Sequence, residues 1–203
     1  LGCTFLKPED ILVVGIPHYD RYQEGATRSK EEFFGQFGLD LGTPLIVYAP
    51  IGDRYLRPNQ TDKFVLERLS RLDLNIIVRM PPTDTVELSG FTSPKAIIVF
   101  DRAGRNAGSR ERKLYEISRE DDERLINMLV YADLVVTGQS TIALDACVFH
   151  KPVIIIYFDP TPQIYWRSIR RYYDYDYYVP LLKSKGVMPA RTPAELDVLI
   201  RQS

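Results

Sequence analysis

The chain has 203 residues, 45% of them hydrophobic, which is enough for one domain with a substantial core and no disulfide or metal staple. Its 26 Lys and Arg residues balance 27 Asp and Glu residues, so no strongly charged surface is expected and nucleic acid is not a predicted partner. The most apolar stretch, residues 142–158, is interrupted by charged residues and a proline, which argues against a transmembrane segment.

The few cysteines and the first residues of the chain predict the cellular compartment of the protein and its domain context. Cys147 lies in an apolar helical stretch that is typical of a buried free thiol, and Cys3 is the only other cysteine. No signal peptide is visible, so the sequence predicts a cytoplasmic protein. Because the chain opens at Leu1 without a methionine and soon reaches a strand-like run, we expect it to be one domain of a longer protein.

Short apolar runs alternate with longer stretches of helical period along the chain, as expected when helices cover both faces of a parallel sheet. The predicted strands are residues 11–14, 45–49, 75–79, 96–100, 134–137 and 153–157. The predicted helices are residues 29–37, 61–72, 119–131, 140–149, 162–172 and 193–201. The predicted fold class is therefore α/β, a Rossmann-like doubly wound parallel sheet of about six strands.

Several predicted boundaries carry their own signals. Ser29 and Ser118 each precede an acidic residue by three positions, the spacing of a capping box, and Thr192 offers a cap followed by a proline. Residues 103–112 are rich in Gly, Arg, Asn and Ser without apolar period, which predicts a loop.

Ligands of a doubly wound sheet bind beyond the carboxyl ends of its strands, so the residues that follow each strand are the candidates for binding. Gly52 and Arg54 follow the strand predicted at 45–49, and Arg79 closes the next one. The planar guanidinium of arginine can hold two oxygens of a diphosphate. A surface salt bridge is the alternative for each arginine.

The segment after the strand at 134–137 has the most specific pattern. Gly138 provides a turn, and a helix is expected to open at Ser140, where unpaired N–H groups and the helix dipole would favour a phosphate. Gln139, Ser140 and Thr141 could add donors around it. Asp145, four residues after Thr141 on the same face, could accept bonds from a ribose diol or an acceptor hydroxyl. Alternatively, Ser140 only caps the helix and Asp145 is a solvated acid.

Other site chemistries are not indicated. The chain has no G-x-S-x-G elbow, no P-loop and no G-x-G-x-x-G turn after its first predicted strand. His18 and His150 are far apart in sequence and lack a second ligand nearby, so neither a metal site nor a cofactor is predicted. The aromatic and arginine-rich residues 164–178 could stack on a base or sugar, or pack the last helix against the sheet or another domain.

Four motifs occur in a characteristic order: Val47-Tyr48-Ala49-Pro50 followed by Arg54, Ile77-Val78-Arg79-x-Pro81, Ala132-Asp133-Leu134 through Ser140-Thr141, and Lys151-Pro152-Val153-Ile154. Together they resemble the C-terminal domain of CDP-glycerol glycerophosphotransferase-like and related GT-B glycosyltransferases, over residues 11–200. The resemblance implies that Gly52, Arg54, Gln139, Ser140 and Thr141 contact a diphosphate and that Asp145 lies near the ribose or the donor.

The same resemblance implies a division of labour between domains. Residues 1–20 would be an interdomain lead-in with the first strand, and residues 21–203 would bind a UDP-, CDP- or GDP-linked donor. A missing N-terminal domain would bind the acceptor and supply any general base, so no catalytic residue is assigned here. Any membrane association would be peripheral, at the inner face of the membrane and through the parent protein.

Three departures from the family pattern bear on the donor. The chain has Arg79-Met80-Pro81 where a basic residue, one further residue and His-Pro are usual, Gly138-Gln139 where an acid is frequent, and His150 where a glycine precedes Lys-Pro. These departures favour a nucleotide-sugar donor, and hence a glycosyltransferase of polysaccharide or glycoconjugate synthesis, over CDP-glycerol. The alternatives are a glycerophosphotransferase, a nucleotide-sugar 2-epimerase and a non-catalytic Rossmann-like domain such as a receiver with Asp101 as phosphoacceptor.

Overall fold

The computed structural model describes residues 7–56, 59–106 and 115–203. Its main sheet contains six strands, β1 (Leu45–Ala49), β2 (Asn75–Met80), β3 (Ile97–Arg102), β6 (Leu134–Thr137), β7 (Val153–Ile156) and β8 (Met188–Ala190). All neighbours are parallel, in the order β3-β2-β1-β6-β7-β8. The order reverses between β1 and β6, the switch point at which ligands of doubly wound sheets bind.

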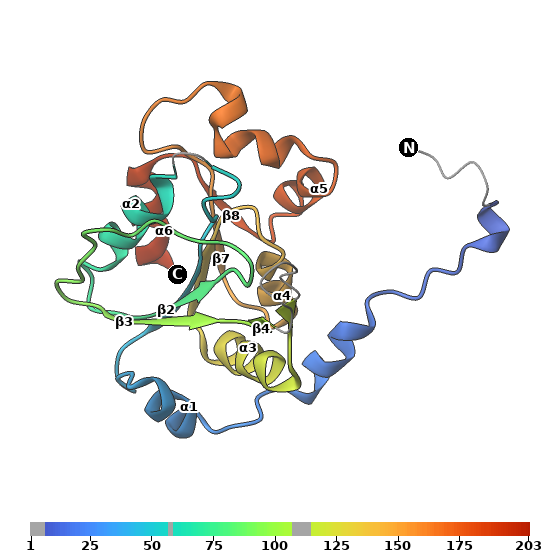
Figure 1. The fold of residues 1–203 in the computed structure, drawn as a ribbon, viewed down its shortest axis with the longest axis horizontal. Helices are drawn as coiled ribbons and strands as arrows, with labels where there is room; N and C mark the ends of the chain where they lie inside the picture. The colour runs from blue at the N-terminus through green and yellow to red at the C-terminus, as the bar shows by residue number, and fades with distance from the viewer. Residues whose placement is uncertain (1–6, 57–58, 107–114) are drawn as a thin grey trace.

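Helices cover both faces of this sheet (Figure 1). They are α1 (Lys30–Phe37), α2 (Thr61–Leu69), α3 (Arg119–Tyr131), α4 (Ile142–Val148), α5 (Tyr178–Lys183) and α6 (Pro193–Gln202). Side chains of α1, α3, α4 and α5 share one apolar core with one face of the sheet, and those of α2 and α6 share a second core with the other face. The predicted Rossmann-like doubly wound parallel sheet of six strands is therefore confirmed.

Strand β1 shows why the strands could be predicted from apolar runs in the sequence. Val47 packs into the first core and Ile46 and Tyr48 into the second, and all three are almost fully buried. A strand buried on both faces needs a continuous apolar run instead of an alternating one.

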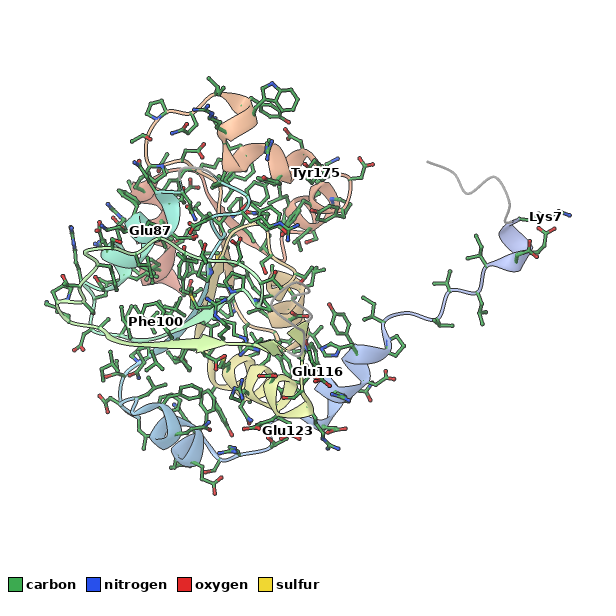
Figure 2. The ribbon with its side chains drawn as sticks, in the orientation of Figure 1. Lys7, Glu87, Phe100, Glu116, Glu123 and Tyr175 are labelled. Carbon is green, nitrogen blue, oxygen red and sulfur yellow. The ribbon has the colours of Figure 1, made fainter. Side chains whose placement is uncertain are left out.

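The strand predicted at residues 11–14 is wrong. This segment is extended but unpaired, and the exposed fractions of Leu12 and Val13 are 83% and 89%. Figure 1 shows it running away from the body of the domain, and Figure 2 shows Lys7 at its far end. The sixth strand is β8, which the sequence analysis missed because Pro189 interrupts a very short run. Proline is tolerated there because β8 is an edge strand.

The helix predicted at residues 162–172 is also wrong. Two short 3₁₀ helices, η3 (Tyr165–Arg167) and η4 (Ile169–Asp174), occupy this region. Between them the backbone of Ser168 is extended, because its Oγ donates to Asp159 Oδ2 at 2.5 Å and accepts from the N–H of Arg170 at 3.1 Å. An α-helix could not pass through a residue held in this way.

The loop predicted at residues 103–112 is only partly described. Its first residues include a two-residue strand, β4 (Arg105–Asn106), which pairs with β5 (Tyr115–Glu116), and residues 107–112 lie outside the described part of the chain. The predicted helix caps are confirmed. Ser29 and Ser118 each form a capping box, and Thr192 Oγ1 accepts from the N–H of Glu195 at 3.1 Å.

A buried carboxylate, Asp62 on α2, fixes the loop that follows β1. Its Oδ1 accepts from the Tyr48 hydroxyl at 2.5 Å and from the Ile51 N–H at 2.9 Å. Its Oδ2 accepts from the Gly52 N–H at 3.0 Å and from Asn59 Nδ2 at 2.6 Å. Burial raises the pKa of Asp62, and these four hydrogen bonds act in the opposite direction. Buried polar groups need hydrogen-bond partners, and the Asp62 carboxylate supplies them for the backbone N–H groups of the loop after β1 and for the Tyr48 hydroxyl.

The same loop continues past a position that requires glycine. Gly52 has a φ of 87°, and a Cβ there would lie 2.3 Å from Asp84 Oδ2. Asp84 accepts from the backbone N–H of Arg54 at 3.0 Å, which holds the next turn. A glycine is therefore required at position 52 by the positive φ and by the close approach of Asp84.

We expect Leu66→Ala to lower the free energy of unfolding by about 2–5 kcal/mol, because its fully buried side chain would leave a cavity. Leu12→Ala, the matched control in the exposed segment, should change it by less than about 0.5 kcal/mol. Urea denaturation followed by circular dichroism measures both. An equal loss for Leu12→Ala would mean that the segment at 11–14 packs into the domain.

Asp62→Asn should lower the free energy of unfolding by about 2–3 kcal/mol, because the amide would present an N–H₂ group to donors that now meet a carboxylate oxygen. Tyr48→Phe, which removes one donor from the same carboxylate, should cost about 1 kcal/mol. Thermal unfolding of the two variants tests the ranking. Wild-type stability of Asp62→Asn would show that the network does not hold the loop.

Candidate functional site

A cavity of about 880 Å³ opens at the carboxyl ends of β1 and β2 and the start of α4, at the switch point of the sheet. Its remaining walls come from the start of α3 and from a 3₁₀ helix of the N-terminal segment, η2 (Pro17–Glu24). The polar and aromatic side chains that line it are His18, Tyr19, Arg21, Tyr22, Arg79, Asp122, Ser140, Thr141 and Asp145.

The cavity brings together four of the residues predicted from sequence, Arg79, Ser140, Thr141 and Asp145. The other four, Gly52, Arg54, Gly138 and Gln139, lie in the two neighbouring loops and do not line it. The side chain of Arg54 is exposed outside the cavity. A ligand role for these four residues stays a prediction.

Gly138 has a structural reason to be glycine. A Cβ at this position would lie 2.4 Å from Ile51 Cγ1 and 3.3 Å from Ile169 Cδ1, so a side chain would push the loop after β6 away from the loop after β1. The Oε1 atom of Gln139, the next residue, is buried and has no hydrogen-bond partner among the described residues.

The helix after this turn begins later than predicted. Helix α4 starts at Ile142, not at Ser140, and has seven residues. The N–H of Ser140 is already bonded to the carbonyl of Gly138 at 2.9 Å, and the N–H of Ile142 meets Ser140 Oγ at 3.4 Å. Two of the expected phosphate donors are therefore used within the turn, and the hydroxyls of Ser140 and Thr141 remain on the cavity wall.

Arg79 lines the cavity and also forms a buried ion pair. It pairs with Asp101, its register partner on β3, and its Nη2 lies 3.5 Å from the carbonyl oxygen of Asp121. Arg124 also approaches Asp101, with Nε 3.3 Å from Oδ1. Burial and the neighbouring Arg124 lower the pKa of Arg79 to about 10, so it stays charged at neutral pH. Because Asp101 is buried and paired, the structure argues against its use as a receiver phosphoacceptor.

The N-terminal segment supplies a cavity wall that the sequence analysis did not identify. Arg21 Nη1 lies 2.5 Å from Asp122 Oδ2 on α3, and His18 Nε2 lies 4.0 Å from Asp122 Oδ1. The ring of Tyr22 packs against Phe149 at 5.1 Å. Aromatic residues at positions 18, 19 and 22 share one side of a helical turn, and this spacing was the available signal.

Asp145 is half-buried and faces this wall. Burial raises the pKa of its carboxyl, while the hydroxyls of Tyr22 and Tyr19 and the ring of His18 act in the opposite direction. The alternative that Asp145 is a fully solvated acid is therefore excluded.

The aromatic residues of the segment 164–178 divide into two groups. Tyr172, Tyr173 and Tyr178 pack into the core, as the packing interpretation predicted. The other four, Tyr165, Trp166, Tyr175 and Tyr177, are exposed, by 46% to 71%. None of the seven lines the cavity at the switch point.

His150 occupies a position that favours glycine. Its φ is 55°, in the left-handed region, and the next residue, Lys151, donates its N–H to the carbonyl of Ala146 at 3.0 Å to close the end of α4. The left-handed conformation explains why glycine is usual before Lys-Pro. His150 adopts this conformation too, at some cost in backbone strain. It does not line the cavity.

The described part of the chain contains no helix that is long and apolar enough to cross a membrane. Within the same ranges, no group of three His, Cys, Asp or Glu residues could hold a metal ion.

Three solved structures illustrate what the chain is similar to. The wall teichoic acid polymerase TagF is 21% identical over 76% of this chain and 34% of its own, with a TM-score of 0.45. The Escherichia coli ADP-heptose lps heptosyltransferase II is 13% identical over 87% and 53% of the two chains (TM-score 0.46). A Veillonella parvula glycosyl transferase of family 9 is 12% identical over 92% and 44% (TM-score 0.41).

The chain spans about a third of the length of the TagF structures that it matches. No curated protein matches its sequence. The family model CDP-Glycerol:Poly(glycerophosphate) glycerophosphotransferase matches residues 3–181, which is most of the chain and includes the N-terminal segment, both loops and α4. The resemblance inferred from the four motifs is confirmed, and the chain belongs to the CDP-glycerol:poly(glycerophosphate) glycerophosphotransferase family.

Proposed function

We propose that this chain is the donor-binding domain of a transferase and that it holds a nucleotide-diphosphate-linked donor in the cavity at the switch point. The observation that carries this proposal is the position of the cavity, between the carboxyl ends of β1 and β2 and the start of α4, in a chain of this family. Its volume of about 880 Å³ is in the range of sites for nucleotide-sized ligands.

The lining residues suggest how the donor is held. Arg79 offers a guanidinium at the wall nearest β2, and Ser140 and Thr141 offer hydroxyls just before the start of α4. The guanidinium is largely neutralised by Asp101, so we expect it to orient phosphate oxygens by hydrogen bonding more than by net charge. In the transfer step these donors would stabilise the charge that develops on the departing nucleotide.

We propose further that the acceptor, and any general base, belong to a second domain of a longer protein. The exposed apolar residues at 11–14 support this, because an apolar run with both faces in water is typical of a segment that packs against another folded unit. A cytosolic location, peripheral at the membrane through that longer protein, stays a prediction.

Titration calorimetry of the wild-type chain with CDP, UDP and GDP tests donor binding. At least one should bind at millimolar concentration or below, and Thr141→Val should weaken it about fivefold by removing one hydroxyl from the cavity wall. Thr92→Val, an exposed threonine outside the cavity, is the matched control and should bind as the wild type does. Failure of all three nucleotides to bind would refute the donor-binding role.

The released nucleotide distinguishes the possible reactions of the parent protein. Transfer of glycerol phosphate from CDP-glycerol breaks the bond between the two phosphates and releases CMP, whereas glycosyl transfer breaks the sugar–oxygen bond and releases a nucleoside diphosphate. The family favours CMP, and the departures at Met80, Gly138 and His150 favour the diphosphate. Product analysis by chromatography decides, and an epimerised free nucleotide-sugar would contradict both transferase reactions.

A further inference from the structure

One titratable side chain on the cavity wall has no role in the proposed function so far. His18 on η2 is the one histidine among the described residues that line the cavity, and its side chain is 42% exposed. Histidine is the side chain whose charge ordinarily changes near neutral pH. The other histidine of the chain, His150, does not line the cavity. Any titration of a histidine in the cavity therefore belongs to His18.

The imidazole of His18 is held in place by two buried neighbours. Its ring meets that of Tyr22 edge to face at 5.4 Å, and Tyr22 packs against Phe149, just after α4, at 5.1 Å. Its Nε2 lies 4.0 Å from Asp122 Oδ1 on α3. Because these contacts come from different elements, the position of the imidazole is set before a ligand binds.

Charged groups of other elements also face His18. Burial raises the pKa of Asp145 on α4, and the charge of His18 acts in the opposite direction, so the imidazole lies near the first turn of α4. Arg21 uses the same carboxylate as His18, with Nη1 2.5 Å from Asp122 Oδ2. When His18 is protonated, one carboxylate therefore meets two cations. The remaining titratable residues of the lining are Tyr19, Tyr22 and Arg79.

The cavity has no excess of positive charge while His18 is neutral. Its lining contains two arginines and two aspartates. Asp101, the buried partner of Arg79, adds a further carboxylate behind the wall. An anion that leaves water for such a site gains little compensation for its lost hydration. Protonation of His18 supplies the positive charge that the other lining residues do not.

We infer that His18, in its protonated form, binds the diphosphate of the donor, so that donor binding takes up a proton from solvent. Both ring nitrogens of an imidazolium donate, so one can meet Asp122 and the other a phosphate oxygen. This inference rests on the proposed function, because it assumes that the cavity holds a nucleotide-diphosphate-linked donor.

The test is the pH dependence of donor affinity in the wild type and in His18→Gln, measured by titration calorimetry. The ligands are CDP-glycerol, UDP-glucose and GDP-mannose, whose diphosphates are esterified at both ends and do not titrate near neutral pH. The wild-type affinity for the donor that binds should fall about three- to tenfold as pH rises from about 5.5 to about 8.5, because the imidazole loses its charge. His18→Gln should lose most of this dependence.

Two further variants separate charge from structure. His18→Lys keeps a positive charge over the whole range, so its affinity should change little with pH and should exceed that of His18→Gln at high pH. His150→Asn is the matched control outside the cavity, since asparagine tolerates the left-handed backbone at that position. It should bind as the wild type does at every pH.

Proton uptake gives a readout that needs no variant. Near pH 7.5, the wild-type binding enthalpy should depend on the ionisation enthalpy of the buffer, because a proton is taken from the buffer when the donor binds. Equal enthalpies in phosphate and Tris buffers, after correction for dilution, would overturn the role of His18. So would a pH dependence in His18→Gln as steep as in the wild type.

These outcomes leave donor binding itself in place. Failure of the wild-type chain to bind any of the three donors at any pH would instead overturn the proposed function, and the role of His18 with it. One set of titrations therefore distinguishes the two failures.

Discussion

The carboxylate of Asp62 holds together the end of the central strand on which the donor cavity is built. Strand β1 is buried on both faces, so the backbone groups just beyond it have no access to water. Asp62 accepts from two of them, the N–H groups of Ile51 and Gly52, and from the hydroxyl of Tyr48 below. Such a network is stable only when each member is paired. The loop it fixes then packs closely against Gly138, in the turn that leads to Ser140 and Thr141.

Charge in the cavity is arranged in pairs. Arg79 meets Asp101 and Arg21 meets Asp122, so that two guanidinium groups are placed near a ligand without a strongly positive field. Buried or half-buried cations require such partners, because an isolated charge away from water is costly. The remaining polar residues of this lining include Ser140, Thr141 and Asp145.

The N-terminal segment has two parts with opposite properties. Residues 17–24 form η2, pack against α3 and α4 and contribute to the cavity, whereas residues 11–14 are extended and exposed. Any unit that packs against the exposed part would therefore be joined directly to a wall of the donor site. In a two-domain transferase this connection would link the position of the second domain to the geometry of the donor cavity.

The sequence by itself determined the fold class, because strands buried on both faces are continuous apolar runs such as β1, and capping boxes mark helix starts such as that of α3. It also located one side of the cavity, at Ser140, Thr141 and Asp145. It could not exclude residues 11–14 from the sheet, because an apolar run is the same whether or not a partner strand is present. Only the tertiary structure decided that Arg79 is neutralised by Asp101 and that η2 closes the cavity, since both depend on contacts between residues distant in the chain.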